Sequence, residues 1–232
     1  MRPYGAGVET FVVRVWMPDR PGALGQVASR IGAVGGDVVG IDILERGADR
    51  AIDELVVQLP DANLLELLLR EINDVDGVDV EDVRPAAESL RDPRLAALET
   101  AAMLVGATSV TELLELLAQH AHYDFAADWA AIIDLELEEI RAAVGPVPPA
   151  AWLRAFVEGS RTSARVVSGE SGPDEVVWAP LASAGLSLVL GRSGRPLRGR
   201  ERRQAAALVR IADARWAEVV VRDSQARHPS VI

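Results

Sequence analysis

The sequence predicts an α+β protein of two domains, on three observations. The chain has 232 residues, which at about 150 residues per domain allows one or two domains. Residues 9–84 switch between strand and helix periodicity in the order β-α-β-β-α-β. Residues 91–222 combine helical segments with apolar runs of strand length, and residues 84–88 are typical of a linker. We therefore expect two α+β domains, at residues 9–84 and 91–222.

The first domain is expected to have the ferredoxin-like fold. Alternating apolar residues predict strands at residues 9–16, 39–43, 55–59 and 78–83. Apolar residues spaced three or four apart predict helices at residues 24–34 and 64–72. Pro21 suits the first position of the first helix, and Gly35 and Gly36 follow its end.

The second domain is expected to place helices around an antiparallel sheet. Helices are predicted at residues 90–105 and 110–120, after residues 148–149, and from about residue 199 to residue 220. Strands are predicted at residues 129–135, 140–144, 176–181 and 186–190. The apolar run at residues 129–135 is typical of a strand that is covered on both faces.

Composition excludes several classes of function. The net charge of −11 argues against nucleic acid as the main partner and against an anionic membrane surface. The sequence has no cysteine, which excludes disulfides, thiolate nucleophiles and cysteine-ligated metals. It also has no lysine, which excludes a Schiff base. With no apolar run of about 20 residues and no signal peptide at the start, a cytoplasmic location is expected.

The loop before the first helix can bind an anion. Gly22, Ala23 and Leu24 open that helix, so their backbone N–H groups are expected to lack internal partners. Together with the helix dipole they favour a carboxylate, and Asp19 could accept an ammonium group. The alternative is a strand-to-helix turn with no ligand, in which Asp19 serves the turn and Pro21 the helix start.

The sequence Asp-Arg-Pro-Gly-Ala-Leu at residues 19–24, followed by Gly-Gly-Asp at residues 35–37, carries a resemblance to a known family. Residues 9–84 resemble an ACT domain, a module that senses small molecules. The resemblance implies an amino acid bound between two copies, against the second strand of the neighbouring sheet. The residues it implies for ligand binding are Asp19, Arg20, Pro21, Gly22, Ala23, Leu24, Asp37, Val38, Val39 and Gly40.

A homodimer joined at this sheet edge is expected, because long apolar edges are rarely left open. The alternative is a monomer whose edge strand is guarded by Asp42 and Glu45. Residues 91–222 resemble a GAF-like domain, on the stretch at residues 176–181 and the segment at 185–191. That resemblance implies a sensory fold, but it does not indicate which ligand this domain binds.

Two further clusters have both a functional and a structural interpretation. His120 and His122, with Asp124 nearby, could bind a metal, but residues two apart on a helix point to different faces. We therefore expect a polar helix end and no metal site. The arginines at residues 192–203 could clamp a phosphate. A solvated loop, or a contact with the acidic remainder, is the favoured alternative.

These observations favour a non-catalytic regulatory protein that binds an amino acid or related metabolite and passes its occupancy to the second domain. No catalytic residue and no cofactor is expected, since the sequence has neither a Gly-x-Ser-x-Gly elbow nor a phosphate-binding glycine loop. An unknown protein partner would receive the signal. The alternative is an oligomerisation scaffold without its own ligand, and an enzyme acting through the second domain ranks last.

Overall fold

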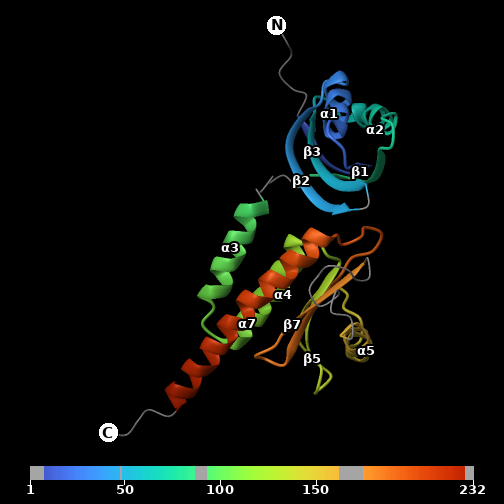
Figure 1. Ribbon diagram of the computed structural model, residues 1–232. Helices are drawn as coiled ribbons and strands as arrows, with labels where there is room; N and C mark the ends of the chain where they lie inside the picture. Colours follow the sequence, from blue (N-terminus) through green and yellow to red (C-terminus); the bar gives the residue numbers. More distant parts are fainter. Residues whose placement is uncertain (1–7, 48, 87–92, 162–174, 228–232) are drawn as a thin grey trace. The chain divides into compact units, whose positions relative to one another are not determined.

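The chain forms two compact units, each with its own sheet and core (Figure 1). The computed structural model describes residues 8–47, 49–86, 93–161 and 175–227. The first unit is Met1–Leu90 and the second is Arg91–Ile232. Among the helices described, none is long and apolar enough to cross a membrane.

The first unit has the predicted order of strands and helices. Its elements are β1 (Glu9–Pro18), α1 (Ala23–Ala33), β2 (Asp37–Gly47), β3 (Arg50–Leu59), a 3-10 helix η1 (Ala62–Leu64), α2 (Leu65–Asn73) and β4 (Asp79–Pro85). The four strands form one antiparallel sheet in the order β2-β3-β1-β4. The ferredoxin-like prediction is therefore confirmed, and β2 lies at an edge of the sheet.

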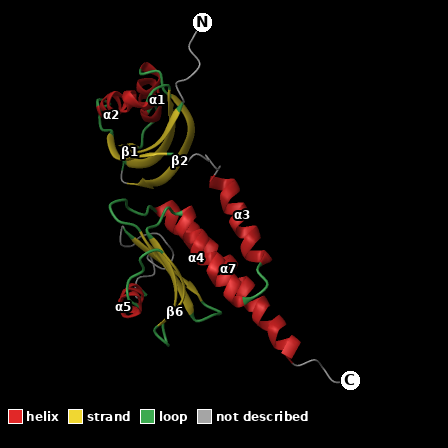
Figure 2. Ribbon diagram, turned by 180° about the vertical axis from the view of Figure 1, so that it is seen from behind, coloured by secondary structure: helices red, strands yellow, loops and turns green. Residues whose placement is uncertain are grey.

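Both helices of the first unit cover the same face of its sheet (Figures 1 and 2). Alternate residues of β1 and β3 point into this layer and pack on α1 and α2, which gives the strand pattern seen in the sequence. Each fully buried aliphatic side chain contributes about 1.5–3 kcal/mol. The central buried residues are Val13, Val15, Val27, Ile31, Leu55, Val57, Leu68 and Ile72.

The second unit also contains a four-stranded antiparallel sheet, in the order β6-β5-β8-β7. Its elements are α3 (Pro93–Gly106), α4 (Val110–Asp124), β5 (Trp129–Asp134), β6 (Glu139–Val144), α5 (Ala150–Ser160), β7 (Val176–Leu181), β8 (Leu186–Gly191) and α7 (Gly199–Arg227). The prediction of helices around an antiparallel sheet is confirmed.

Helices cover both faces of this second sheet (Figure 2). On one face Ala130 and Ile132 of β5 pack with residues of α4 and α7. On the other face Ala131 and Ile133 pack with residues of α5 such as Leu153. Strand β5 is therefore buried on both sides, as its apolar run predicts. Helix α3 packs on α4 and α7.

Candidate functional site

The loop between β1 and α1 is fixed by main-chain hydrogen bonds. The Asp19 N–H donates to the Asp49 carbonyl at 2.9 Å, and the Arg20 N–H donates to the Pro18 carbonyl at 2.9 Å. Gly22 has a φ of 88°, a left-handed conformation that glycine adopts without the strain a side chain would add. The chain therefore enters α1 in a defined geometry that needs glycine at this position.

The first turn of α1 leaves main-chain donors open. Ala23 does not supply one, because its N–H donates to the Arg20 carbonyl at 3.2 Å; the expectation that it is open is wrong. In the part of the chain that the structure describes, no acceptor lies on the N–H groups of Gly22, Leu24 and Gly25, and no side chain caps the helix. Such unpaired donors, together with the helix dipole, favour an anion.

The backbone is open at the two glycines among these residues. Gly22 and Gly25 are both exposed, and a Cβ atom built on either would meet no other atom within 4 Å. A small ligand can therefore approach the backbone closely at the start of α1.

A buried carboxylate lies at the same end of the sheet. Asp53 of β3 is paired with Val15 of β1 and with Ile43 of β2, and it is 4% exposed. Its Oδ1 atom has no hydrogen-bond partner among the residues described. Burial raises the pKa of the Asp53 carboxyl, the nearby charge of Arg46 works to lower it, and that of Asp19 works to raise it. Buried polar groups are rarely left unpartnered, so this carboxylate is suited to an external partner.

Two charged side chains, Arg46 and Asp19, act on this carboxylate from two other segments. Arg46 of β2 lies with its Nε atom 4.0 Å from Oδ1 of Asp19, and both act electrostatically on Asp53. Two carboxylates against one guanidinium leave a net negative charge, which favours a cationic group beside them. The start of α1 together with Asp19, Arg46 and Asp53 forms one corner of the first unit. This corner presents anion-binding donors at α1 and a cation-binding carboxylate at β3.

The remaining predicted site residues lie at the other end of β2. Asp37 pairs with Gln58 of β3, whereas Arg46 pairs with Ala51, so the two ends of β2 lie tens of ångströms apart at about 3.3 Å per residue. Val38 packs on the core, while Val39 is 45% exposed at the position where the register shifts. One chain therefore does not bring residues 37–40 together with residues 19–24.

A comparison with known families decides what the first unit is. A model of the ACT domain family matches residues 11–77. The chain contains an ACT domain. The solved ACT domain of a GTP pyrophosphokinase from Chlorobium tepidum is 16% identical, with a TM-score of 0.27, and the match covers 34% of this chain and 88% of that one.

Other solved structures are similar to parts of the chain. An uncharacterised protein from Thermotoga maritima is 20% identical, with 35% of this chain and all of that one covered and a TM-score of 0.29. A free methionine-R-sulfoxide reductase from Neisseria meningitidis, solved with its substrate, is 14% identical, with 59% and 95% covered and a TM-score of 0.41. No curated protein matches the chain.

Sequence reasoning missed three contributors to the corner of the ACT domain. These are Gly25, Arg46 and Asp53. Of these, Asp53 leaves a readable signal, because it occupies an inward position in a strand whose other inward residues, such as Leu55 and Val57, are apolar. A lone carboxylate in such an alternation points to a functional or strained position.

The open donors at α1 can be tested by giving the helix its own cap. Gly25→Glu places a carboxylate at the third helical position, from which it can reach back to the Gly22 N–H. We expect Gly25→Glu to stabilise the ACT domain by about 1 kcal/mol and to weaken binding of a carboxylate ligand at least tenfold. Thermal unfolding and titration calorimetry measure the two effects. The neutral control Gly25→Gln should gain stability and keep most of the affinity for the carboxylate ligand. If the Gly25→Glu and Gly25→Gln variants bind that ligand equally well, the assignment is contradicted.

The His120 region of the second unit has a structural role. The Oγ1 hydroxyl of Thr100 in α3 donates to Oδ2 of Asp124 at 2.8 Å and lies 3.1 Å from Nδ1 of His120. Asp124 and His120 are one turn apart on α4, so the cluster ties α3 to α4. No group of three metal-ligating side chains occurs in the described residues.

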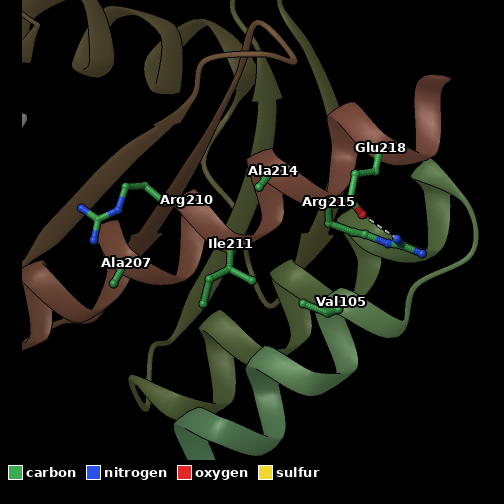
Figure 3. A pocket seen from close by; sticks show the side chains of 7 residues that line it. All are labelled: Val105, Ala207, Arg210, Ile211, Ala214, Arg215 and Glu218. Atoms are coloured by element: carbon green, nitrogen blue, oxygen red, sulfur yellow. Dashed lines mark hydrogen bonds and ion pairs between the residues drawn. The ribbon is translucent and has the colours of Figure 1, made fainter.

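A groove runs between α3 and α7 of the second unit (Figure 3). It has a volume of about 420 Å³. Its lining residues are Val105 of α3 and, from α7, Ala207, Arg210, Ile211, Ala214, Arg215 and Glu218. The groove is distant in sequence from the candidate site of the ACT domain and is lined largely by aliphatic side chains.

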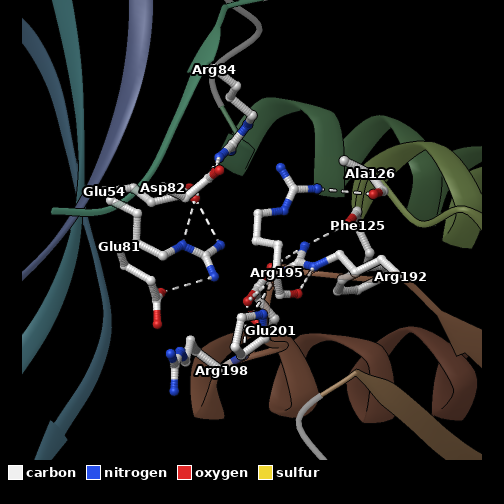
Figure 4. Close-up of polar contacts among 12 residues, drawn as sticks. Glu54, Glu81, Asp82, Arg84, Phe125, Ala126, Arg192, Arg195, Arg198 and Glu201 are labelled. Atoms are coloured by element: carbon white, nitrogen blue, oxygen red, sulfur yellow. Dashed lines mark hydrogen bonds and ion pairs between the residues drawn. The ribbon is translucent and has the colours of Figure 1, made fainter. Parts of the chain in front are cut away.

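The first arginine of the basic segment is internal. Arg192 is 4% exposed, and its Nη1 atom donates to the Phe125 carbonyl at 2.7 Å and lies 2.8 Å from the Glu201 carboxylate (Figure 4). The neighbouring Arg195 donates to the Ala126 carbonyl at 3.0 Å. These two guanidiniums therefore fix the turn after α4, and the expectation of a solvated loop is wrong for Arg192.

A second ion-pair cluster lies on the ACT sheet, on the face opposite to the helices. Glu54 of β3 accepts from Nε and Nη2 of Arg14 at 3.0 and 2.8 Å, and from Nη1 of Arg84 at 3.0 Å (Figure 4). Burial works to raise the pKa of Glu54, but the charges and hydrogen bonds of Arg84 and Arg14 outweigh it and hold this pKa below its ordinary value. This carboxylate is therefore engaged within the domain.

Proposed function

We propose that the ACT domain binds a small zwitterion, an amino acid or a related metabolite, at the start of α1. The observation that carries this proposal is the open N–H groups of Leu24 and Gly25 at the same end of the domain as the unpartnered Asp53 carboxylate. The helix start favours the ligand's carboxylate, and Asp53 with Asp19 favours its ammonium group. An α-amino acid carries its ammonium and carboxylate groups on the same carbon atom.

The resemblance to ligand-binding ACT domains supports a second copy as the other wall of the site. Strand β2 is a sheet edge, and its residues Val39, Ile41 and Ile43 are 41–45% exposed. A homodimer joined at this edge would cover them and would bring Asp37 and Gly40 of one copy towards the loop of the other. Dissociation constants between millimolar and micromolar, which correspond to binding free energies of about −4 to −8 kcal/mol, suit a metabolite sensor.

In this proposal the protein is a non-catalytic regulator in the cytoplasm. The second unit acts as a GAF-like domain that relays occupancy of the ACT site to a protein partner. Ligand binding would change the equilibrium of the second unit by about 1–3 kcal/mol, the usual size of such coupling. The acidic net charge of −11 supports the absence of nucleic acid and anionic membrane among its partners.

Thermal unfolding with each standard amino acid at millimolar concentration tests the proposal. A ligand at 100 times its Kd stabilises the folded state by about 2.7 kcal/mol, which raises the Tm by several degrees. We expect one amino acid, or a few of similar shape, to produce this shift. The amide of that amino acid, which lacks the carboxylate, and its deaminated analogue, which lacks the ammonium, should each fail.

Two outcomes would contradict the proposal. If no amino acid raises the Tm, the ligand class is wrong and the oligomerisation scaffold is the better account. If the deaminated analogue binds as well as the amino acid, the ligand is a simple anion and Asp53 has no part in recognising it.

A further inference from the structure

We infer that the α3–α7 face of the second unit is an interface with a second copy of this chain, packed with antiparallel α7 helices around Ala214. The inference is independent of the ligand site in the ACT domain. It starts from the groove between α3 and α7 (Figure 3), which is bordered by Val105, Ile211 and Ala214.

The apolar character of this face extends well beyond the groove. On α3, Leu95, Leu98 and Val105 lie three and seven residues apart, which places them on one stripe. They are 54%, 68% and 55% exposed. On α7, Val221 is 56% exposed. Helices α3 and α7 pack against each other, and exposed aliphatic side chains on both of them favour an interaction surface here.

The exposed stripe of α7 has a two-fold pattern that identifies its partner. Ala207 and Val221 lie seven residues before and after Ala214, and both are apolar. Arg210 and Glu218 lie four residues before and after it, and they carry opposite charges. In an antiparallel pair with its two-fold axis at Ala214, each position faces the position equally far on the other side. Apolar residues then meet apolar residues, and each arginine meets a glutamate.

The charges also select the direction of the helices. In a parallel pair Arg210 would face its own copy, and so would Glu218, which is repulsive. In the antiparallel pair Arg210 faces Glu218 of the partner subunit, and this contact occurs twice. Within the described part of the chain Arg210 has no ion-pair partner of its own.

Arg215 orients the Glu218 carboxylate for this contact. Arg215 donates twice to the Ala107 carbonyl, at 3.0 and 2.7 Å, and once to Oε2 of Glu218 at 2.8 Å. The Glu218 carboxylate is thereby oriented while its side chain stays 66% exposed. Ala214 at the axis is small, so the two helices can approach to the 8–10 Å that is usual for packed helices.

Charge reversal tests the inference on the full-length protein, with the molecular mass measured by sedimentation velocity. Arg210→Glu and Glu218→Arg each replace two attractive contacts by two repulsive ones. We expect each to weaken self-association through this face at least tenfold and to halve the mass, to a dimer joined at β2 when that edge is also paired and otherwise to a monomer. The double variant restores opposite charges and should recover the wild-type mass. Arg161→Glu, an exposed arginine at the end of α5, is the matched control and should change nothing.

A crosslink gives a second readout that does not depend on charge. The chain has no cysteine, so Ala214→Cys introduces a unique thiol at the proposed axis, and mild oxidation should link two copies quantitatively. Ala151→Cys, on the exposed side of α5, should not link. Single charge variants with unchanged mass, or a double variant no better than either single one, would overturn the inference; so would failure of Ala214→Cys to crosslink.

Discussion

Replacing Asp53 by asparagine is expected to stabilise the free protein and to remove its response to ligand. Burial raises the pKa of this carboxyl, so its ionised form opposes folding near neutral pH. Removing the charge should raise the free energy of unfolding by about 1 kcal/mol. The same change removes the partner of the ligand's ammonium group, which should weaken binding 10- to 100-fold, since a hydrogen bond between charged groups contributes about 1.5–3 kcal/mol.

The pH dependence of this stability gain has a definite sign. Because the folded-state pKa of Asp53 is raised, its contribution to stability is lost as the pH rises through that pKa. The difference in free energy of unfolding between Asp53→Asn and the wild type should therefore be largest near pH 7 and should disappear on acidification towards pH 4. Asp76→Asn, an exposed change in the turn before β4, is the control. A less stable Asp53→Asn variant that still binds ligand would contradict the assignment.

Glu54→Gln is expected to destabilise the ACT domain by about 3 kcal/mol, as breaking a buried ion pair by removing one partner usually costs 3–5 kcal/mol. Arg14 is 0% exposed and directs two N–H groups at the Glu54 carboxylate. The amide cannot balance this guanidinium, and the pairing with Arg84 is lost as well. Chemical denaturation monitored by circular dichroism measures the change. Glu66→Gln on exposed α2 surface should change stability by less than about 0.5 kcal/mol.

Acid should act on this pair in the opposite direction to its action on Asp53. The pKa of Glu54 is held below its ordinary value of 4.5, so the stability it contributes is present above that value and is lost as the pH falls through the lowered pKa. The wild type should therefore lose stability below about pH 4.5, and Glu54→Gln should lack that part of the transition. Equal acid sensitivity in both proteins would show that Glu54 is not held by the two arginines.

Much of the fold could be predicted because its elements carry local signals. Strand β1 alternates strictly between the helix-covered face and the opposite face, and β5 is apolar throughout because both of its faces are covered. Edge strand β2 shows the limit of this reasoning. Its register shifts between Val38 and Gly40, so alternation along the sequence does not show which side chain faces the core.

The candidate site could be predicted only in its local part. The loop at residues 19–24 is a continuous motif, so its position before the first helix could be predicted, whereas the left-handed conformation of Gly22 was found only in the structure. The turn that uses the Ala23 N–H is set by backbone geometry, so Gly25 takes the place of Ala23 among the open donors. Asp53 reaches the site through strand pairing with Val15, across a separation in sequence that periodicity does not span.

The most direct test of the ligand site is a titration followed by amide NMR on the isotope-labelled full chain. The probe is the amino acid that gives the largest thermal shift, with its deaminated analogue as the control. The account predicts that the Leu24 and Gly25 amide resonances shift downfield and saturate with the amino acid, and that the Asp53→Asn variant does not show these shifts. Saturable shifts confined to other parts of the chain, or Leu24 and Gly25 resonances that stay in place, would contradict it.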